Sequence, residues 1–186
     1  QRQMCIETDT ELSDFYTAYC AERPALGYSN HNWTLPEPTA ASYTQELIDN
    51  AKSFSDTAMV VISRVGGEMA DLPTNMDGLN YTENSTEYND FEPGQHYLSL
   101  TKTEKNMIDM VTKNFANVVL VYNGANTLEM GFVNDYPQIK SVIWCPGTGQ
   151  TGFNALGEIV AGEVNPSGHT LSLIHISEPT RPRLIS

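Results

Sequence analysis

The chain has 186 residues, of which 40% are hydrophobic and 18% charged, so it suits one globular domain, or a piece of one, with a hydrophobic core. Its 10 basic residues against 23 acidic ones give a net charge of −13. Such an acidic surface repels nucleic-acid phosphates and anionic lipids, and the sequence has no apolar run of membrane-spanning length. We therefore expect no nucleic-acid partner and no membrane contact from this segment.

Residues 1–41 are mostly polar and include Pro24, Pro36 and Pro38, so they are interpreted as an irregular leading segment or insertion. A helix is expected to follow from Ser42. Residues 42–45 have the form of a capping box, and apolar residues at helical spacing come after them.

Three short apolar runs, residues 58–62, 118–122 and 141–145, predict buried strands. Each run is rich in β-branched residues and uninterrupted, and polar residues, Gly or Pro bound it. This pattern is typical of parallel strands that are covered on both faces of the sheet.

Two further helices are predicted between and after these strands. One begins at a second capping box, Thr101 to Glu104, and continues into an apolar stripe at helical spacing. The other begins after Gly152, where Phe153, Leu156 and Val160 are one and two turns apart. Strands that alternate with amphipathic helices predict an α/β fold, a three-layer α/β/α sandwich with a mainly parallel sheet.

The long connection over residues 64–100 has little periodicity and many acidic residues, and a connection of that length is usually functional or disordered. It opens directly after the first predicted strand with Arg64, Glu68 and Asp71. Loops beyond the carboxyl ends of parallel strands are where α/β sheets place their sites. From composition alone, these carboxylates could equally be solvated loop acids.

Residues 147–152 form a GxGxxG motif between the last predicted strand and the last predicted helix. Such glycines can admit a dinucleotide pyrophosphate at a helix N-terminus, which suggests an oxidoreductase as one possible function. The acidic residue that should follow about 20 positions later is replaced by a turn at residues 164–168. The motif is better interpreted as a tight strand-to-helix turn.

Residues 171–186 change in character, with two Arg, one acidic residue and no helix or strand period. Within them, LSLIHISEPTRP is similar to a translated sequencing adapter. We interpret these residues as a non-native tail that should make few contacts with the rest of the chain.

Several motifs in order carry a family resemblance: SRVGGEMADLP, HYLSLTKTEKNMI, NVVLVYNGANTLEM and SVIWCPGTGQTGFNALGEIVAGEVNPSG. Over residues 42–170 the chain resembles the α/β-sandwich, C-terminal-type domain of glycoside hydrolase family 3, especially bacterial β-glucosidase-like members. The resemblance implies a retaining, exo-acting β-glycosidase that removes terminal β-linked sugars from oligosaccharides or β-glucosides, with no cofactor and no metal. In that family a (β/α)8-like barrel domain of the same protein carries the aspartate nucleophile.

The resemblance also assigns roles to residues. Glu68 matches the Glu of the family's Gly-Glu-Gly loop and is the acid/base candidate. Asp71 matches the acidic position of that loop and would orient Glu68 or bind a sugar hydroxyl, and Arg64 is a second substrate-binding candidate. Met69 departs from the pattern because it replaces the second Gly. If Glu68 is not the acid/base, Glu83 and Glu92 are the next carboxylates to consider.

The nucleophile motif is not in this sequence, so the chain would supply only the acid/base side of the site and should be inactive alone. A second class of function remains open, a non-catalytic domain that contacts carbohydrate or another protein. The two differ in their gene context, because the enzyme requires a barrel with its aspartate motif in the same reading frame.

Overall fold

The computed structural model describes residues 9–22, 37–66, 72–77, 90–149 and 151–168. In chain order its elements are α1 (Thr10–Glu22), η2 (Ala40–Ser42), α2 (Gln45–Phe54), β1 (Thr57–Ser63), α4 (Lys102–Asn114), β2 (Asn117–Asn123), η3 (Gly131–Asp135), β3 (Ile139–Trp144) and α5 (Phe153–Val160). The labels η2 and η3 mark 3-10 helices.

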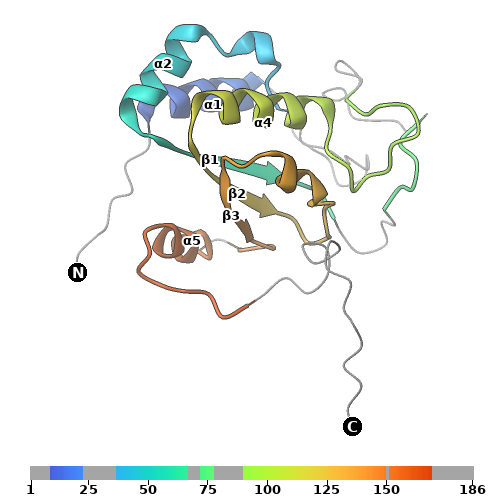
Figure 1. Cartoon of the computed structure of the whole chain (residues 1–186). Helices are drawn as coiled ribbons and strands as arrows, with labels where there is room; N and C mark the ends of the chain where they lie inside the picture. Colours follow the sequence, from blue (N-terminus) through green and yellow to red (C-terminus); the bar gives the residue numbers. More distant parts are fainter. Residues whose placement is uncertain (1–8, 23–36, 67–71, 78–89, 150, 169–186) are drawn as a thin grey trace.

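The three predicted strands form one parallel sheet in the order β1-β2-β3, as Figure 1 shows. Val60 of β1 is in register with Leu120 of the central strand β2, which is in turn in register with Val142 of β3. The predicted fold class, an α/β sandwich with a mainly parallel sheet, is confirmed.

Helix α4 covers one face of this sheet and encloses the main hydrophobic core (Figure 1). Its apolar stripe places Met107 and Ile108 against the strands, as the helical spacing predicts. The other buried members of this cluster come from the same face of the strands and from the segment after β2: Val60, Ile62, Val118, Leu120, Tyr122 and Leu128. The alternation along β1 and β2 therefore separates a core face from a second face.

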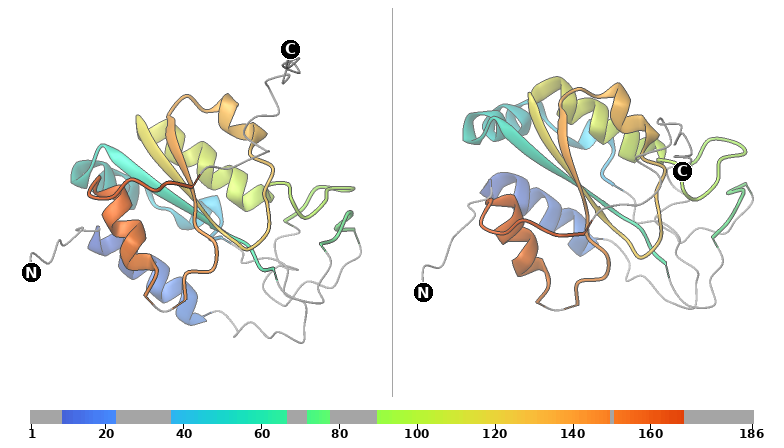
Figure 2. Two further views of the ribbon diagram at one scale, coloured as in Figure 1. Left: turned by 90° about the horizontal axis from the view of Figure 1, so that it is seen from below. Right: turned by 60° about the horizontal axis from the view of Figure 1, so that its bottom comes forward.

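Helix α5 lies on the opposite side of the sheet from α4, and the views in Figure 2 agree on this arrangement. Helices thus flank both faces, but the second face is covered unevenly. Met59 and Val61 of β1 are 44% and 41% exposed, and Phe153 of α5 is 51% exposed. Among the described residues, the hydrophobic side chains that stabilise the fold by burial are therefore mostly on the α4 face.

The helix starts agree with the capping signals in one case and differ in the other. Thr101 and Glu104 form the predicted capping box at the start of α4. Helix α2, however, is capped by Thr44, whose side chain accepts a hydrogen bond from the Leu47 backbone N–H, so the N-cap expected at Ser42 is wrong by two residues. Ser42 instead ends the short helix η2.

The leading segment, which the sequence analysis interprets as irregular, contains the helix α1. The rings of Phe15 and Tyr16 on α1 lie 5.1 and 6.4 Å from the ring of Tyr43, just before α2, measured between centroids. The Tyr16 hydroxyl lies 2.7 Å from that of Tyr43. Burial raises the pKa of the Tyr16 hydroxyl well above its ordinary value. Aromatic packing between α1 and the start of α2 therefore gives this polar segment an anchor on the domain.

The described part of the long connection is ordered by a small second cluster of Met76, Phe91 and Tyr97. Backbone hydrogen bonds join Met76 N to Gln95 O at 2.7 Å and Tyr97 N to Pro73 O at 3.0 Å. The tail at residues 171–186 lies outside the described residues. None of the described helices combines the length and apolar character that crossing a membrane requires.

We expect Leu120→Ala to lower the free energy of unfolding by about 2–5 kcal/mol, because it leaves a cavity in the centre of the sheet. Leu120 is 0% exposed and packs on the α4 face. Met59→Ala, on the exposed face of β1, is the matched control and should cost less than about 1 kcal/mol. Urea unfolding of the chain measures both, and equal losses would contradict the assignment of the core to the α4 face.

Candidate active-site edge

Because β1, β2 and β3 are parallel, their carboxyl ends meet at one edge of the sheet, the usual location of sites in α/β proteins. Hydrogen bonds tie the segments that follow the strands to one another. The Arg64 backbone N–H donates to Asn123 O at 3.0 Å, and the Asn123 side chain donates to Cys145 O at 2.8 Å. The Trp144 indole N–H donates to Gly124 O at 2.9 Å. Hydrogen bonds therefore join the segments that follow the three strands at this edge.

Of the residues predicted to form the site, Glu68 and Asp71 lie outside the described residues, as does Glu83. The structure does describe the residues that immediately precede Glu68 and Asp71, up to Gly66. Strand β1 ends at Ser63, and Gly66 is already beyond the carboxyl edge of the sheet. Glu92 is described, and its side chain is 60% exposed with Oε1 3.4 Å from Lys102 Nζ.

Arg64, a predicted substrate-binding residue, has a side chain that is only 1% exposed. Its guanidinium donates to Tyr97 O at 3.1 Å, to Ser99 O at 2.8 Å and to Glu104 Oε2 at 2.5 Å. These contacts are all internal to the protein, so they favour a structural role and argue against direct contact with a sugar.

The carboxylate that pairs with Arg64 belongs to the capping box of α4. Glu104 Oε2 accepts from the Thr101 backbone N–H at 2.8 Å, and Thr101 Oγ1 accepts from Glu104 N at 3.2 Å. A carboxylate in the first turn also interacts favourably with the positive end of the helix dipole. The same Glu104 side chain therefore starts α4 and balances the buried charge of Arg64.

Asp90 provides a second anchor for the same turn. It is 2% exposed, and its two carboxylate oxygens accept from the backbone N–H and the hydroxyl of Thr103 at 3.1 and 2.8 Å. Burial raises the pKa of Asp90, although the Thr103 hydrogen bonds and the Arg64 charge act in the opposite direction. Asp90 therefore holds the chain that precedes α4 against the first turn of that helix.

Two aromatic rings face the guanidinium of Arg64. Its Cζ lies 5.3 Å from the ring centroid of Tyr97 and 5.7 Å from that of Phe91, within the range of cation–π interactions. Burial raises the pKa of Tyr97 to about 12, so its hydroxyl stays protonated near neutral pH and can donate. It donates to Val65 O, at the start of the segment that leads to Glu68.

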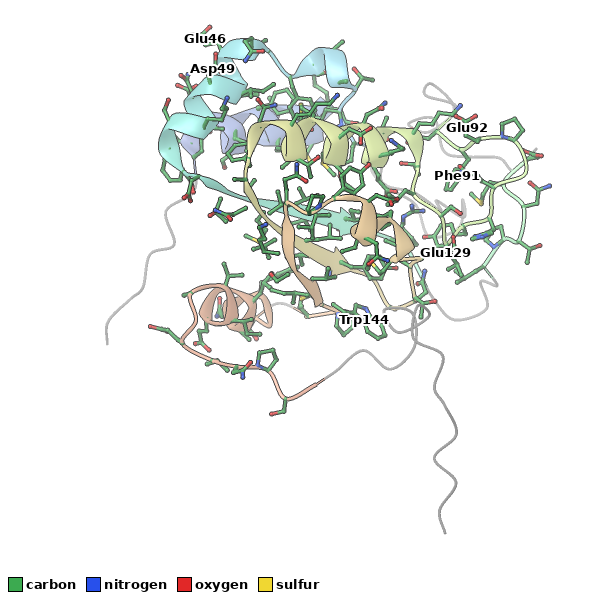
Figure 3. The ribbon with its side chains drawn as sticks, in the orientation of Figure 1. Glu46, Asp49, Phe91, Glu92, Glu129 and Trp144 are labelled. Atoms are coloured by element: carbon green, nitrogen blue, oxygen red, sulfur yellow. The ribbon has the colours of Figure 1, made fainter. Side chains whose placement is uncertain are left out.

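Exposed polar and aromatic groups that the sequence analysis missed also lie toward this edge. Glu129 contacts His96 Nε2 at 3.4 Å and accepts from Ser99 Oγ at 3.3 Å. Figure 3 shows Glu129 and Trp144 toward the carboxyl ends of the strands, whereas Glu46 and Asp49 lie on α2, away from them. The only sequence signal for Glu129 was its position a few residues after a predicted strand, which is too weak to single out one acid.

The glycine motif at residues 147–152 is explained by the turn that it forms. Gly149 has a φ of +61°, a left-handed conformation that favours glycine. A Cβ at Gly152 would lie 2.4 Å from the Thr148 carbonyl oxygen. Both glycines are therefore required by the path of the chain into α5, as the interpretation as a tight turn expects. Within the described ranges, no group of three or more His, Cys, Asp or Glu side chains is arranged to hold a metal ion.

Comparison with known proteins gives a consistent result. Residues 10–178 match the Glycosyl hydrolase family 3 C-terminal domain. Over 161 residues, or 83% of this chain, the sequence is 30% identical to Beta-glucosidase A of Butyrivibrio fibrisolvens, and over 157 residues, or 82%, it is 28% identical to a Beta-glucosidase of Ruminococcus albus. The chain covers only 18% and 14% of those two proteins.

The fold is similar to that of a solved β-glucosidase from Paenibacillus barengoltzii, with a TM-score of 0.63 at 24% sequence identity. The match covers 85% of this chain and 15% of that protein. At this identity the likeness supports the fold alone. The chain thus spans less than a fifth of the length of each of these relatives.

Glu104→Ala should lower the free energy of unfolding by about 3–5 kcal/mol, because the buried guanidinium of Arg64 then has no opposite charge. Lys105→Ala is the matched control on the same turn of α4. Its ion pair with Asp109 is exposed and should be worth about 1 kcal/mol or less. Urea unfolding measures both variants, and a loss at Glu104 no larger than that at Lys105 would refute the structural role of the pair.

Proposed function

Because the chain belongs to glycosyl hydrolase family 3, we propose that it supplies the acid/base side of the active site in a retaining, exo-acting, β-glucosidase-like enzyme. The substrates proposed are oligosaccharides or β-glucosides with a terminal β-linked sugar. A (β/α)8-like barrel domain of the same parent protein supplies the nucleophile. The names of the matched relatives and their much greater length support this proposal.

The observation that carries the proposal is the position from which the segment with Glu68 leaves the sheet. Strand β1 ends at Ser63, and Gly66 lies beyond its carboxyl edge. We propose that the carboxyl group of Glu68, two residues further along the chain, acts at this edge, where α/β folds bind ligands. Retaining hydrolysis needs its two carboxyl groups about 5–5.5 Å apart. An acid/base at the surface of this domain suits that separation from a nucleophile on a docked barrel.

In the first step of the proposed reaction, the protonated Glu68 gives its proton to the glycosidic oxygen while the barrel's aspartate attacks the anomeric carbon. The bond to the leaving group breaks, and a covalent glycosyl-enzyme forms. In the second step the Glu68 carboxylate takes a proton from water, and the water oxygen displaces the aspartate. Asp71 orients Glu68 or binds a sugar hydroxyl, and Arg64 holds the surrounding structure without contacting the sugar.

In the parent enzyme, Glu68→Gln should reduce hydrolysis of poor leaving groups by about 10²–10⁴-fold, the usual contribution of general acid–base catalysis. Activated aryl glycosides should lose less in the glycosylation step, because their leaving groups depart without a proton. Azide should partly restore their turnover, because it attacks the glycosyl-enzyme without a general base. Steady-state kinetics over a series of aryl β-glucosides measures the pattern.

Asp71→Asn is the companion variant in the same segment. It should lower activity by a similar factor on all leaving groups and show no azide rescue, as expected for an orienting or sugar-binding group. If Glu68→Gln keeps full activity on every leaving group, Glu68 is not the acid/base. The test then moves to Glu83 and Glu92.

The chain on its own should not hydrolyse an aryl β-glucoside, because the nucleophile and most of the sugar pocket are proposed to lie on the barrel. The folded chain is assayed beside the parent enzyme at equal molar concentration. Turnover by the chain alone would contradict the proposed division of the site. A parent reading frame without a barrel and its aspartate motif would favour the non-catalytic carbohydrate-contacting alternative.

A further inference from the structure

We propose that Trp144 and Glu129 bind the sugar of the leaving group and so form a subsite at the carboxyl edge of the sheet. The ligand is the pyranose on the far side of the bond that is cleaved. This inference rests on the proposed function, because only a glycosidase that acts on oligosaccharides has such a leaving group. It gives a role to two exposed side chains that the proposed reaction does not otherwise use.

Trp144 presents a large aromatic surface in a fixed orientation. It is the last residue of β3 and is 42% exposed. Its indole N–H donates to Gly124 O at 2.9 Å, so the one polar atom of the side chain is already satisfied within the protein. A pyranose has a face made of C–H groups, which an exposed indole ring can cover by apolar contact. Trp144 thus offers a flat surface to a sugar ring.

Glu129 presents a carboxylate beside a histidine. Its side chain is 53% exposed, whereas its backbone N–H is fixed by a hydrogen bond to Leu98 O at 3.0 Å. Oε2 accepts from Ser99 Oγ at 3.3 Å, and Oε1 lies 3.4 Å from His96 Nε2. A carboxylate has more acceptor positions than these two contacts use. It can therefore also accept from sugar hydroxyls, and hydrogen bonds to a charged acceptor are the stronger ones.

Both side chains lie where the α4 side of the sheet meets its carboxyl edge. Trp144 is in register with Tyr122, which is buried in the core under α4, and residues in register on parallel strands point to the same face. Leu128, immediately before Glu129, packs in that same core. The loop after β2 folds back on its strand, because the Tyr122 hydroxyl donates to Thr127 O at 3.5 Å. This one loop therefore holds Trp144 near its start and carries Glu129 near its end (Figure 3).

The same loop lies beside the chain that leads to the proposed acid/base. A Cβ placed on Gly66 would lie 1.9 Å from Asn126 Oδ1, so the Asn126 side chain is next to that backbone. Gly66 is the last residue described before the segment with Glu68. An acid/base protonates the oxygen between the two sugars, so the leaving-group sugar lies next to it in the reaction. The adjacency therefore assigns the loop to that sugar rather than to the sugar attacked by the barrel's aspartate.

The test compares substrates of the parent enzyme that share a poor leaving oxygen and differ in the second sugar. These are methyl β-glucoside and β-linked glucose disaccharides. Both need protonation, so the ratio of their kcat/KM values reports contacts to the leaving-group sugar. Trp144→Ala and Glu129→Gln should each lower kcat/KM for the disaccharides by about 10-fold relative to methyl β-glucoside. Trp144→Phe, which keeps an aromatic ring, should lose less.

Phe54→Ala and Glu46→Gln are the matched controls. Phe54 is 50% exposed at the end of α2, just before β1 begins, and is therefore at the opposite edge of the sheet. Glu46 lies on α2 as well, away from the carboxyl ends of the strands (Figure 3). Both variants should leave the ratio unchanged. An equal loss on both substrates in Trp144→Ala would assign the ring to contact with the barrel and overturn the proposal.

Binding without turnover separates this proposal from the proposed function. A thio-linked glucose disaccharide, which resists hydrolysis, is titrated by calorimetry into the parent enzyme and its variants. The Kd should rise about 10-fold in Trp144→Ala and stay unchanged in Phe54→Ala. If Glu68→Gln lacks its leaving-group pattern but this difference in Kd is found, the proposed function fails and the sugar site stands. If Kd is the same in both variants, or the unaltered enzyme binds no disaccharide, the subsite is rejected. Should Trp144→Ala not fold, an unchanged Kd in Glu129→Gln is sufficient to reject it.

Discussion

The buried charge of Arg64 is the constraint on which the carboxyl edge of this domain depends. A guanidinium removed from water is costly unless hydrogen-bond acceptors and an opposite charge surround it. Here the partners are the carboxylate of Glu104 and the carbonyls of Tyr97 and Ser99. The carbonyls and the carboxylate lie 33 to 40 residues along the chain from Arg64. One side chain at the end of β1 therefore fixes where the long connection returns to the sheet and where α4 begins.

The planar fork of arginine suits this task better than a lysine ammonium would. Its terminal nitrogens donate in fixed, different directions, so Nη1 reaches one carbonyl while Nη2 serves a carbonyl and a carboxylate. The flat guanidinium also lies within cation–π distance of Phe91 and Tyr97. The small apolar cluster around those rings and the ion pair are consequently one unit, although the sequence gives no indication that they meet.

Local signals predicted the fold well, and longer-range contacts escaped prediction for physical reasons. The capping box at Thr101 and the three apolar runs depend on neighbours within a few residues, so the sequence carries them directly. Helix α1 was not predicted, because its segment as a whole is polar and contains several prolines. Its apolar residues Leu12, Phe15, Tyr16 and Tyr19 do recur at helical spacing.

The burial of Arg64 could not be predicted, since a basic residue after a strand is as suited to a ligand as to a partner 40 residues away. The roles of Glu68 and Asp71 come from the family resemblance and stay predictions.

The ion pair also bears on the chemistry proposed for this edge. A general acid must keep its proton until the transition state, and an uncompensated positive charge nearby favours the carboxylate form instead. Arg64 is only four residues before Glu68 in the sequence, so a free guanidinium there would work against proton donation. Pairing with Glu104 at 2.5 Å offsets this charge within the domain, although Arg64 still acts to lower the pKa of nearby Asp90. The contact that orders the edge thus also weakens the positive field of the cation that is nearest to the proposed acid along the chain. This is a reason for the arginine at the end of β1 to be buried and paired rather than exposed to substrate.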